Sequence, residues 1–345
     1  MEKINVDLHS DTQTRPSPGM REAMAKAPVG DEQRGEDPSV NKLCEMAAEL
    51  TGKESAVFMP SGTMCNQASV LVHCQPGDEI IADKTSHLIN SESGGAAALA
   101  GVQIKSINGK RGIFTATQAE DAVNMKKRNI PCTRMIEIEQ TSNAGGGSIW
   151  PLEQIREVAD IARKFGLVMH MDGARLLNAA VASNVMTADF ARPFDSLWVD
   201  LSKGLGCPVG AVLCGSSDFI EKAWSWKMRL GGAMRQSGIV AAAGVYALEN
   251  NVARLADDHT LAKRFADKIS GIAGIELWPV ETNLVFFSVK ETGLTARIFH
   301  ERLLERGVRI GIKNEYEMRA VTHLDVDSAE IAQAADAVAQ VAAAA

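Results

Sequence analysis

Short apolar runs alternate with longer stretches of helical periodicity over the first two thirds of the chain. The runs are SAVFM, EIIAD, VQIKSI, RMIEIE, LVMHMD and SLWVD, and amphipathic stretches such as PLEQIREVADIARKFG separate them. A strand that is apolar along its whole length is buried on both faces, which is typical of parallel sheets. The pattern therefore predicts an α/β fold in which helices cover both faces of a mostly parallel sheet.

The last third of the chain has a different order of elements. A long helical stretch over 252–272 is followed by four short apolar runs, IELWP, NLVFFSV, VRIGI and MRAVTH, with helical sequence between them. This order predicts a smaller α+β unit. We expect an N-terminal arm over 1–14, a large domain over 15–250 and a small C-terminal domain over 251–345.

Composition excludes several classes of protein. The 345 residues carry a net charge of -7 and the basic side chains form no long cluster, which argues against a nucleic-acid partner. Neither a signal peptide nor a bilayer-spanning run is present in these residues, so we expect a cytoplasmic protein with no membrane partner. The six cysteines stand singly with no zinc spacing, which predicts reduced thiols and no metal site.

Polar residues follow the apolar runs at the points where strands should end. In open α/β sheets ligands bind outside the carboxyl ends of the strands, so these short segments are the candidate site. They are PSGT at 60–63, SH at 86–87, EQTSN at 139–143, DGAR at 172–175 and SKG at 202–204. Ser61, Gly62 and Thr63 open a helix, where backbone N–H groups favour an anion such as phosphate, although the same letters also cap helices that bind nothing.

Three further side chains at these strand ends suggest one cofactor. Asp172 could face a protonated pyridine nitrogen, or simply pair with Arg175. Lys203 follows a buried strand and precedes glycines, so it could be either a Schiff-base lysine or a solvated loop residue. His87 could stack on a cofactor ring or act as a base. A phosphate cradle, a histidine, an aspartate and a lysine together are what pyridoxal phosphate requires from a protein.

Longer strings give a specific resemblance. DLHSDTQTRP, GEDPSVNKLC, PSGTMCNQ, MDGARLLNAA, LSKGLGCPVG, GGAMRQSG and VTHLDV are spread over nearly the whole chain. The chain resembles the L-threonine aldolase family, which has the pyridoxal phosphate fold shared with aspartate aminotransferase. The resemblance implies cleavage of a β-hydroxy-α-amino acid such as threonine, allo-threonine, phenylserine or a polar analogue. The products of this cleavage would be glycine and an aldehyde. The resemblance also implies that the protein is at least a dimer and, as is usual in the family, a homotetramer.

The resemblance also implies roles for single residues. Lys203 binds the cofactor covalently, Asp172 pairs with its ring nitrogen, His87 stacks on the ring, and Ser61, Gly62 and Thr63 hold the phosphate. Arg235 reaches the phosphate of a neighbouring subunit's cofactor. The substrate carboxylate is held by Ser10, Arg175 and Arg319, and Arg175 lies beside the cofactor as well.

The chain departs from the family pattern on the substrate side. Ser142 replaces a histidine beside the β-hydroxyl, so His87 or a water would have to act as the base. Arg34 replaces a tyrosine at the pocket mouth and either favours a polar substrate or points to solvent. Met228 replaces a lysine, for which Lys227 or Arg229 could compensate at the shared phosphate edge.

Two alternatives to an aldolase remain open. A β-eliminating lyase would use the same cofactor and scaffold but release a 2-oxo acid and ammonia. A weakly active paralogue that serves as a binding subunit is more remote, because Lys203, Asp172 and His87 are all retained.

Overall fold

The computed structural model describes residues 4–125 and 127–344 and contains two sheets. The seven-stranded sheet has the order β2 (Ser55–Met59), β8 (Ala211–Gly215), β7 (Ser196–Asp200), β6 (Val168–Asp172), β5 (Thr133–Glu139), β3 (Glu79–Asp83) and β4 (Gln103–Ile107). Strand β8 is antiparallel to both of its neighbours, and the other pairs are parallel. The predicted mostly parallel sheet is confirmed. Strand β8 was not predicted, because its run AVLCG is not among the strands expected from the sequence.

Alternation along the strands places helices on both faces of this sheet. Val57 and Met59 pack in one cluster with helices α3 and α10, whereas Phe58 between them faces the opposite cluster. The helices of this part are α1 (Pro18–Ala25), α2 (Pro38–Thr51), α3 (Gly62–His73), α4 (His87–Asn90), α5 (Gly95–Ala100), α6 (Ala116–Ala122), α7 (Leu152–Phe165), α8 (Leu176–Ser183), α9 (Thr187–Ala191), α10 (Ser217–Arg229) and α11 (Gly238–Asn250). Helix α2 has the expected signals, with Asp37 as the N-cap and Gly52 in the left-handed region after its end.

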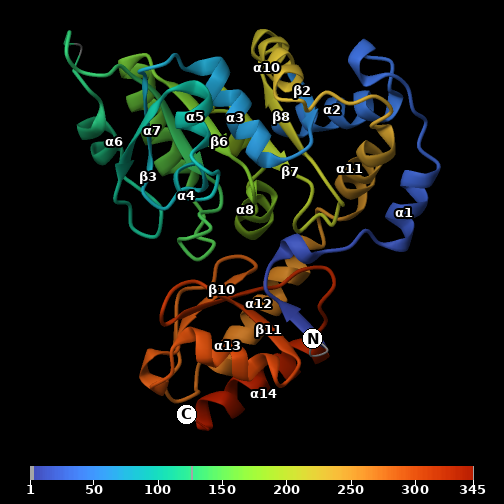
Figure 1. The fold of residues 1–345 in the computed structure, drawn as a ribbon, viewed down its shortest axis with the longest axis vertical. Helices are drawn as coiled ribbons and strands as arrows, with labels where there is room; N and C mark the ends of the chain where they lie inside the picture. The colour runs from blue at the N-terminus through green and yellow to red at the C-terminus, as the bar shows by residue number, and fades with distance from the viewer. Residues whose placement is uncertain (1–3, 126, 345) are drawn as a thin grey trace.

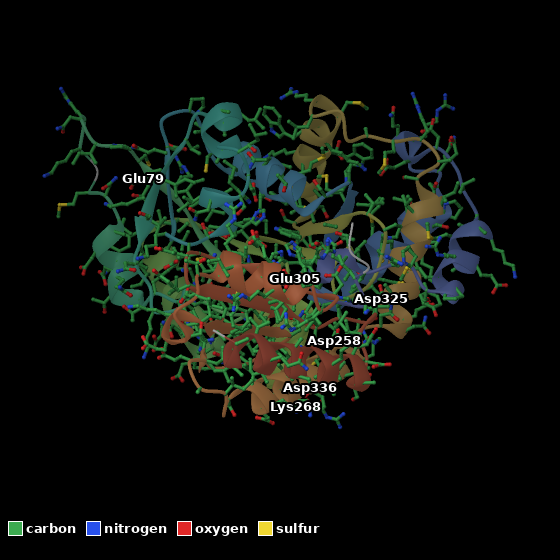
Figure 2. All side chains as sticks on the ribbon, turned by 60° about the horizontal axis from the view of Figure 1, so that its bottom comes forward. Glu79, Asp258, Lys268, Glu305, Asp325 and Asp336 are labelled. Carbon is green, nitrogen blue, oxygen red and sulfur yellow. The ribbon has the colours of Figure 1, made fainter. Side chains whose placement is uncertain are left out.

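The second sheet has five strands in the order β1 (Val6–Leu8), β11 (Val308–Ile312), β12 (Glu317–Val321), β10 (Leu284–Ser288) and β9 (Glu276–Leu277). It packs with α12 (Leu255–Ile269), α13 (Ala296–Leu304) and α14 (Ser328–Ala343) around a hydrophobic cluster of its own. Figure 1 shows this part below the large sheet and holding both ends of the chain. Figure 2 labels exposed Lys268 and Asp336 on its helices. The expected boundaries at residues 14 and 250 stay predictions.

Three short 3-10 helices complete the described elements, at Asp11–Gln13, Glu32–Arg34 and Lys290–Thr292. No helix among residues 4–125 and 127–344 is both long enough and apolar enough to cross a bilayer. All six cysteines are free, and four of them are buried.

Candidate active site

Lys203 lies in the turn after β7, at the carboxyl edge of the large sheet. Its Nζ donates a hydrogen bond of 2.6 Å to Asp200 Oδ2, and its side chain is 20% exposed. The indole ring of Trp198 lies 5.6 Å from the same nitrogen. The turn needs glycine at Gly206, which has a φ of 77° and where a Cβ would come within 2.5 Å of Leu324. A lysine amine is therefore held in a partly enclosed position by a carboxylate three residues earlier.

Asp200 is a site residue that the sequence reading missed. Its other oxygen accepts hydrogen bonds from the backbone N–H and hydroxyl of Ser202, at 2.7 and 2.9 Å, which fixes the direction of the carboxylate. The available signal was its spacing, because Asp200 is the last residue of β7 and precedes Lys203 by three positions.

Asp172 ends β6 and is 1% exposed. Its Oδ2 accepts from Asn66 Nδ2 at 2.9 Å and its Oδ1 accepts from the Ala174 N–H at 3.0 Å. Burial raises the pKa of this carboxyl, and the nearby charges of His87 and Lys203 oppose that rise. A carboxylate this deep requires cationic neighbours, and a protonated ring nitrogen would be one.

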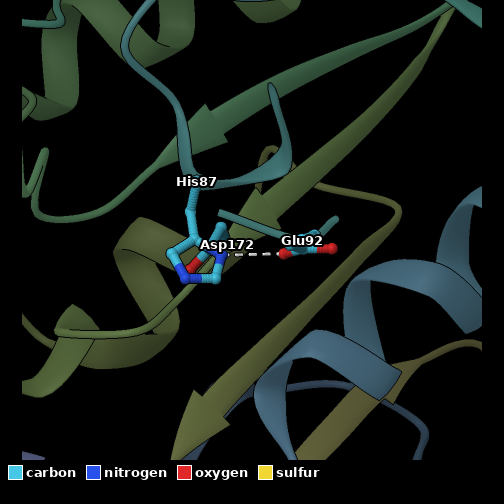
Figure 3. A group of neighbouring side chains, drawn as sticks. All are labelled: His87, Glu92 and Asp172. Atoms are coloured by element: carbon cyan, nitrogen blue, oxygen red, sulfur yellow. Dashed lines mark hydrogen bonds and ion pairs between the residues drawn. The ribbon is translucent and has the colours of Figure 1, made fainter. Parts of the chain in front are cut away.

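His87 opens helix α4 and forms a cluster with two buried carboxylates, which Figure 3 shows. Its Nδ1 lies 2.9 Å from Glu92 Oε1, and this hydrogen bond is the main reason that the pKa of the imidazole is raised. Atoms of His87, Glu92 and Asp172 all lie within 4.8 Å of one another, a spacing that a metal ion could use. Glu92, however, also accepts hydrogen bonds from Asn66 at 2.6 Å and Gln67 at 2.5 Å, so its oxygens already have partners. The expectation of no metal stays a prediction.

The N-terminus of α3 carries the three residues that are expected to hold the phosphate. Ser61 is the N-cap, and its hydroxyl accepts the Met64 N–H at 3.1 Å. Within the described part of the chain the N–H groups of Gly62 and Thr63 make no hydrogen bond. A Cβ at Gly62 would lie 2.2 Å from the ring of Trp198, so only glycine fits there. Two free N–H groups at the positive end of a helix suit a phosphate.

Two arginines lie together on the opposite side of the site. Arg175 is buried, and its Nε and Nη2 both donate to Asp11, at 2.8 and 2.7 Å. Arg319, on β12, donates to Asn143 Oδ1 at 3.0 Å and to the His9 carbonyl at 3.3 Å. Burial, followed by the neighbouring Arg175, lowers the pKa of Arg319. Arg175 is buried and Arg319 is partly buried, and among the described residues only Arg175 is paired with a carboxylate, so positive charge remains for a substrate carboxylate.

Ser10 lies in sequence between His9 and Asp11, the hydrogen-bond partners of these two arginines, and caps the short helix at Asp11–Gln13. Its hydroxyl accepts the Thr12 N–H at 3.2 Å and the Thr12 hydroxyl at 2.9 Å, and the residue is 6% exposed. The serine can therefore still donate its own proton to an acceptor, as a carboxylate ligand requires.

The role expected of Ser142 at the substrate hydroxyl stays a prediction, and in this structure the serine is enclosed by protein. Its Oγ accepts the Gly145 N–H at 3.2 Å, and the residue is 2% exposed. On its other side it lies so close to Gly112 that a Cβ there would come within 2.0 Å of the serine oxygen. Ser142 is thus enclosed in its own loop, and the neighbouring Asn143 faces the pocket beside His87 instead.

Arg34 and Arg235 lie apart from the Lys203 cluster within one chain. Both approach Asp31, Arg235 at 2.8 Å and Arg34 at 3.9 Å, with side chains that are 61% and 72% exposed. Their roles at a neighbouring subunit's cofactor or at a pocket mouth stay predictions. Lys227 cannot serve the phosphate edge, because it is fully buried in an ion pair with Glu32.

Comparison with known proteins assigns this arrangement to a family. A family model described as beta-eliminating lyase matches residues 7–292, which include every site residue above except Arg319. The chain belongs to the beta-eliminating lyase family. The low specificity L-threonine aldolase of Escherichia coli (strain K12) is 42% identical over 96% of this chain and 97% of its own length. Low-specificity L-threonine aldolase 1 of Arabidopsis thaliana is 40% identical over 95% of this chain and 93% of its own.

A solved structure supports the fold of this beta-eliminating lyase family member. The threonine aldolase of Leishmania major matches it with a TM-score of 0.84 at 19% identity, covering 98% of this chain and 99% of the other. The resemblance, the fold class and the class of enzyme, a pyridoxal phosphate-dependent lyase, are confirmed. The residues present also fit the cofactor, because a lysine amine, a buried carboxylate, an imidazole and a free helix N-terminus meet at one sheet edge.

Proposed function

We propose that this lyase cleaves the Cα–Cβ bond of a β-hydroxy-α-amino acid to give glycine and an aldehyde. The observation that carries the proposal is the meeting of the Lys203 amine, the Asp172 carboxylate and the His87 imidazole at one edge of the large sheet. The names of the relatives support the same reaction, since they are L-threonine aldolases.

Pyridoxal phosphate, when bound, supplies an electron-poor ring that takes up the electron pair released at Cα. Lys203 would hold it covalently and would be the amine that is displaced and then restored in each turnover. Asp172 would keep a proton on the ring nitrogen, because its buried carboxylate favours a cation beside it. The free N–H groups of Gly62 and Thr63 would bind the phosphate.

Arg319 and Arg175 would fix the substrate through its carboxylate. Within the described residues the Arg175 side chain donates hydrogen bonds to Asp11 alone, through Nε and Nη2, so its Nη1 is available. A rigid carboxylate clamp matters because the bond that breaks must be held in one orientation to the acceptor group.

His87 is the group that we assign to the β-hydroxyl proton. Glu92 fixes its Nδ1, which leaves Nε2 to accept the proton as the aldehyde forms. Ser142 is enclosed in its own loop, and a serine hydroxyl does not easily take a proton at neutral pH, which supports His87 for this role.

Product analysis tests the proposal. With purified protein, added pyridoxal phosphate and L-threonine, we expect glycine and acetaldehyde in equal amounts. Release of 2-oxobutanoate and ammonia instead would establish the β-eliminating alternative. No turnover of any β-hydroxy amino acid, with the cofactor bound, would favour the binding paralogue. The cytoplasmic location and the homotetramer expected from the sequence stay predictions.

A further inference from the structure

A pocket of about 260 Å³ includes His87 in its lining. Because we assign His87 to the β-hydroxyl proton, the β-substituent of the substrate would lie near this pocket. The pocket is bordered by the carboxyl edge of the large sheet and by the turn between β11 and β12 of the small sheet. Its lining consists of Lys84, Thr85, His87, Asn90, Ser91, Glu139, Asn143, Ala144 and Lys313. Ala144 is the one apolar residue in this set, so polar and charged side chains supply the rest of the lining.

Two lysines give this pocket a positive charge. Lys84 comes from the turn after β3 and Lys313 from the turn after β11, so the two sheets contribute one each. Both are exposed, and within the described part of the chain neither forms an ion pair. An ammonium group without a counter-ion beside a binding pocket favours an anionic ligand.

The acid in the pocket, Glu139, is held by the protein. Glu139 accepts the His87 N–H at 2.9 Å and the Asn143 N–H at 2.8 Å, so both of its oxygens are occupied by the protein. Burial raises the pKa of Glu139 to about 7, so part of this carboxyl is protonated at neutral pH.

We propose that the preferred substrates are β-hydroxy-α-amino acids whose β-carbon carries a carboxylate group. This inference rests on the proposed aldolase function and adds the substrate class. For 3-hydroxyaspartate the Cα–Cβ bond breaks, its electron pair stays with Cα and the β-hydroxyl proton leaves as the C=O bond forms. Cα then takes up a proton, so the products are glycine and glyoxylate and all atoms are accounted for.

The proposed substrate class rests on Lys84 and Lys313 and does not depend on Arg34. The Arg34 side chain is 72% exposed beside Asp31 and does not line the pocket, so its replacement tests a different idea. Substitution of Lys84 and Lys313 by glutamine removes charge while keeping most of the length and polarity of each side chain.

The test uses the holoenzyme and compares three substrates by glycine release. These are 3-hydroxyaspartate, 3-hydroxyasparagine and threonine, each as the threo and the erythro isomer. The first two have nearly the same size and shape but differ in the charge of the β-substituent, a carboxylate in one and an amide in the other. We expect kcat/KM to be about tenfold higher for 3-hydroxyaspartate than for 3-hydroxyasparagine, and each of Lys84→Gln and Lys313→Gln to reduce that ratio by up to about fivefold. Lys222→Gln, on the exposed face of α10, serves as the matched control and should leave the ratio unchanged.

Each other outcome has a defined meaning. If threonine is cleaved as well as 3-hydroxyaspartate, or if the preference survives in the Lys84→Gln, Lys313→Gln double variant, the substrate class is wrong and the aldolase reaction stands. If none of the three substrates yields glycine while the cofactor is bound, the aldolase proposal and this inference both fail.

Discussion

Burial differs sharply between the two sides of the candidate active site. On the cofactor side Asn66, Glu92 and Asp172 are 1%, 5% and 1% exposed, and hydrogen bonds link all three. On the substrate side Lys84, Ser91 and Lys313 are exposed and come from loops of two different sheets. The buried residues of the cofactor side hold the groups that act on the cofactor in one arrangement. Exposed residues on the substrate side can be substituted at little cost in stability, so this side determines the substrate.

Replacing Lys203, the residue expected to bind the cofactor covalently, should cause the largest loss of activity. Lys203→Ala removes the only amine at the end of β7, so we expect kcat to fall by about 10³-fold or more, as when a covalent nucleophile is deleted. This fall in kcat is measured by glycine release at saturating pyridoxal phosphate. Lys222→Ala is the control. Retention of more than a tenth of the activity would show that Lys203 is not the anchor.

Removing the charge of Asp172 should lower kcat less than removing Lys203, but more than replacing a loop residue of the substrate side. Asp172→Asn keeps the shape of the side chain and removes its negative charge, and its one oxygen can accept only one of the two hydrogen bonds from Asn66 and Ala174, so we expect kcat to fall by about 10²-fold. The comparison with wild type is made at saturating cofactor to separate catalysis from binding. An unchanged kcat would mean that no cationic group of the reaction lies beside this carboxylate.

Asp200 should have a smaller, positioning effect. Asp200→Asn removes the charged partner of the Lys203 Nζ, and we expect kcat to fall by about tenfold with little change in KM. Asp218→Asn, which affects only the exposed pair with Lys222, is the matched control. A larger change in KM than in kcat would instead indicate that Asp200 acts on substrate binding.

A buried acid below the site should affect stability alone. Neither oxygen of Glu137 on β5 has a hydrogen bond partner, and burial raises the pKa of this carboxyl well above its usual value. The folded state therefore keeps a proton that the unfolded chain loses above its ordinary pKa, so stability falls as pH rises. Glu139 on the same strand contributes in the same direction. Burial raises its pKa to about 7, so the stability that its proton provides is lost between about pH 4.5 and 7.

Glu137→Leu should therefore stabilise the protein by about 1–3 kcal/mol at pH 8 and by less at pH 4.5. Denaturant unfolding at the two pH values measures the difference. Glu45→Leu on the exposed face of α2 is the control and should change stability by at most about 0.5 kcal/mol. A destabilised Glu137→Leu would show that the carboxyl has partners that the folded chain requires.

The cofactor side was the more predictable of the two. Apolar runs located strands β5, β6 and β7, and the polar residue after each run located Asp172 and Lys203, because parallel strands end at a common edge. The cap of α2 was readable for a similar reason, since Asp37, Pro38 and Gly52 act through local geometry alone. Strand β8 was missed because its antiparallel place beside β2 and β7 depends on contacts far apart in sequence.

Side-chain direction in loops could not be read from the sequence. Ser142 turns inward because the Gly145 N–H and the close approach of Gly112 hold its hydroxyl, and neither is visible in the string EQTSN. Lys313 reaches the same pocket as Lys84 only because the small sheet packs against the edge of the large one. Periodicity describes the elements, but the substrate side is assembled from loops that lie between them.

The most direct test of the central claim is the position of the cofactor on the chain. The holoenzyme is reduced with borohydride, digested and analysed by peptide mass spectrometry. We predict that the added mass lies on Lys203 within DLSKGLGCPVG. Attachment to another lysine, such as Lys84 or Lys313, or the absence of any attached mass, would contradict the account.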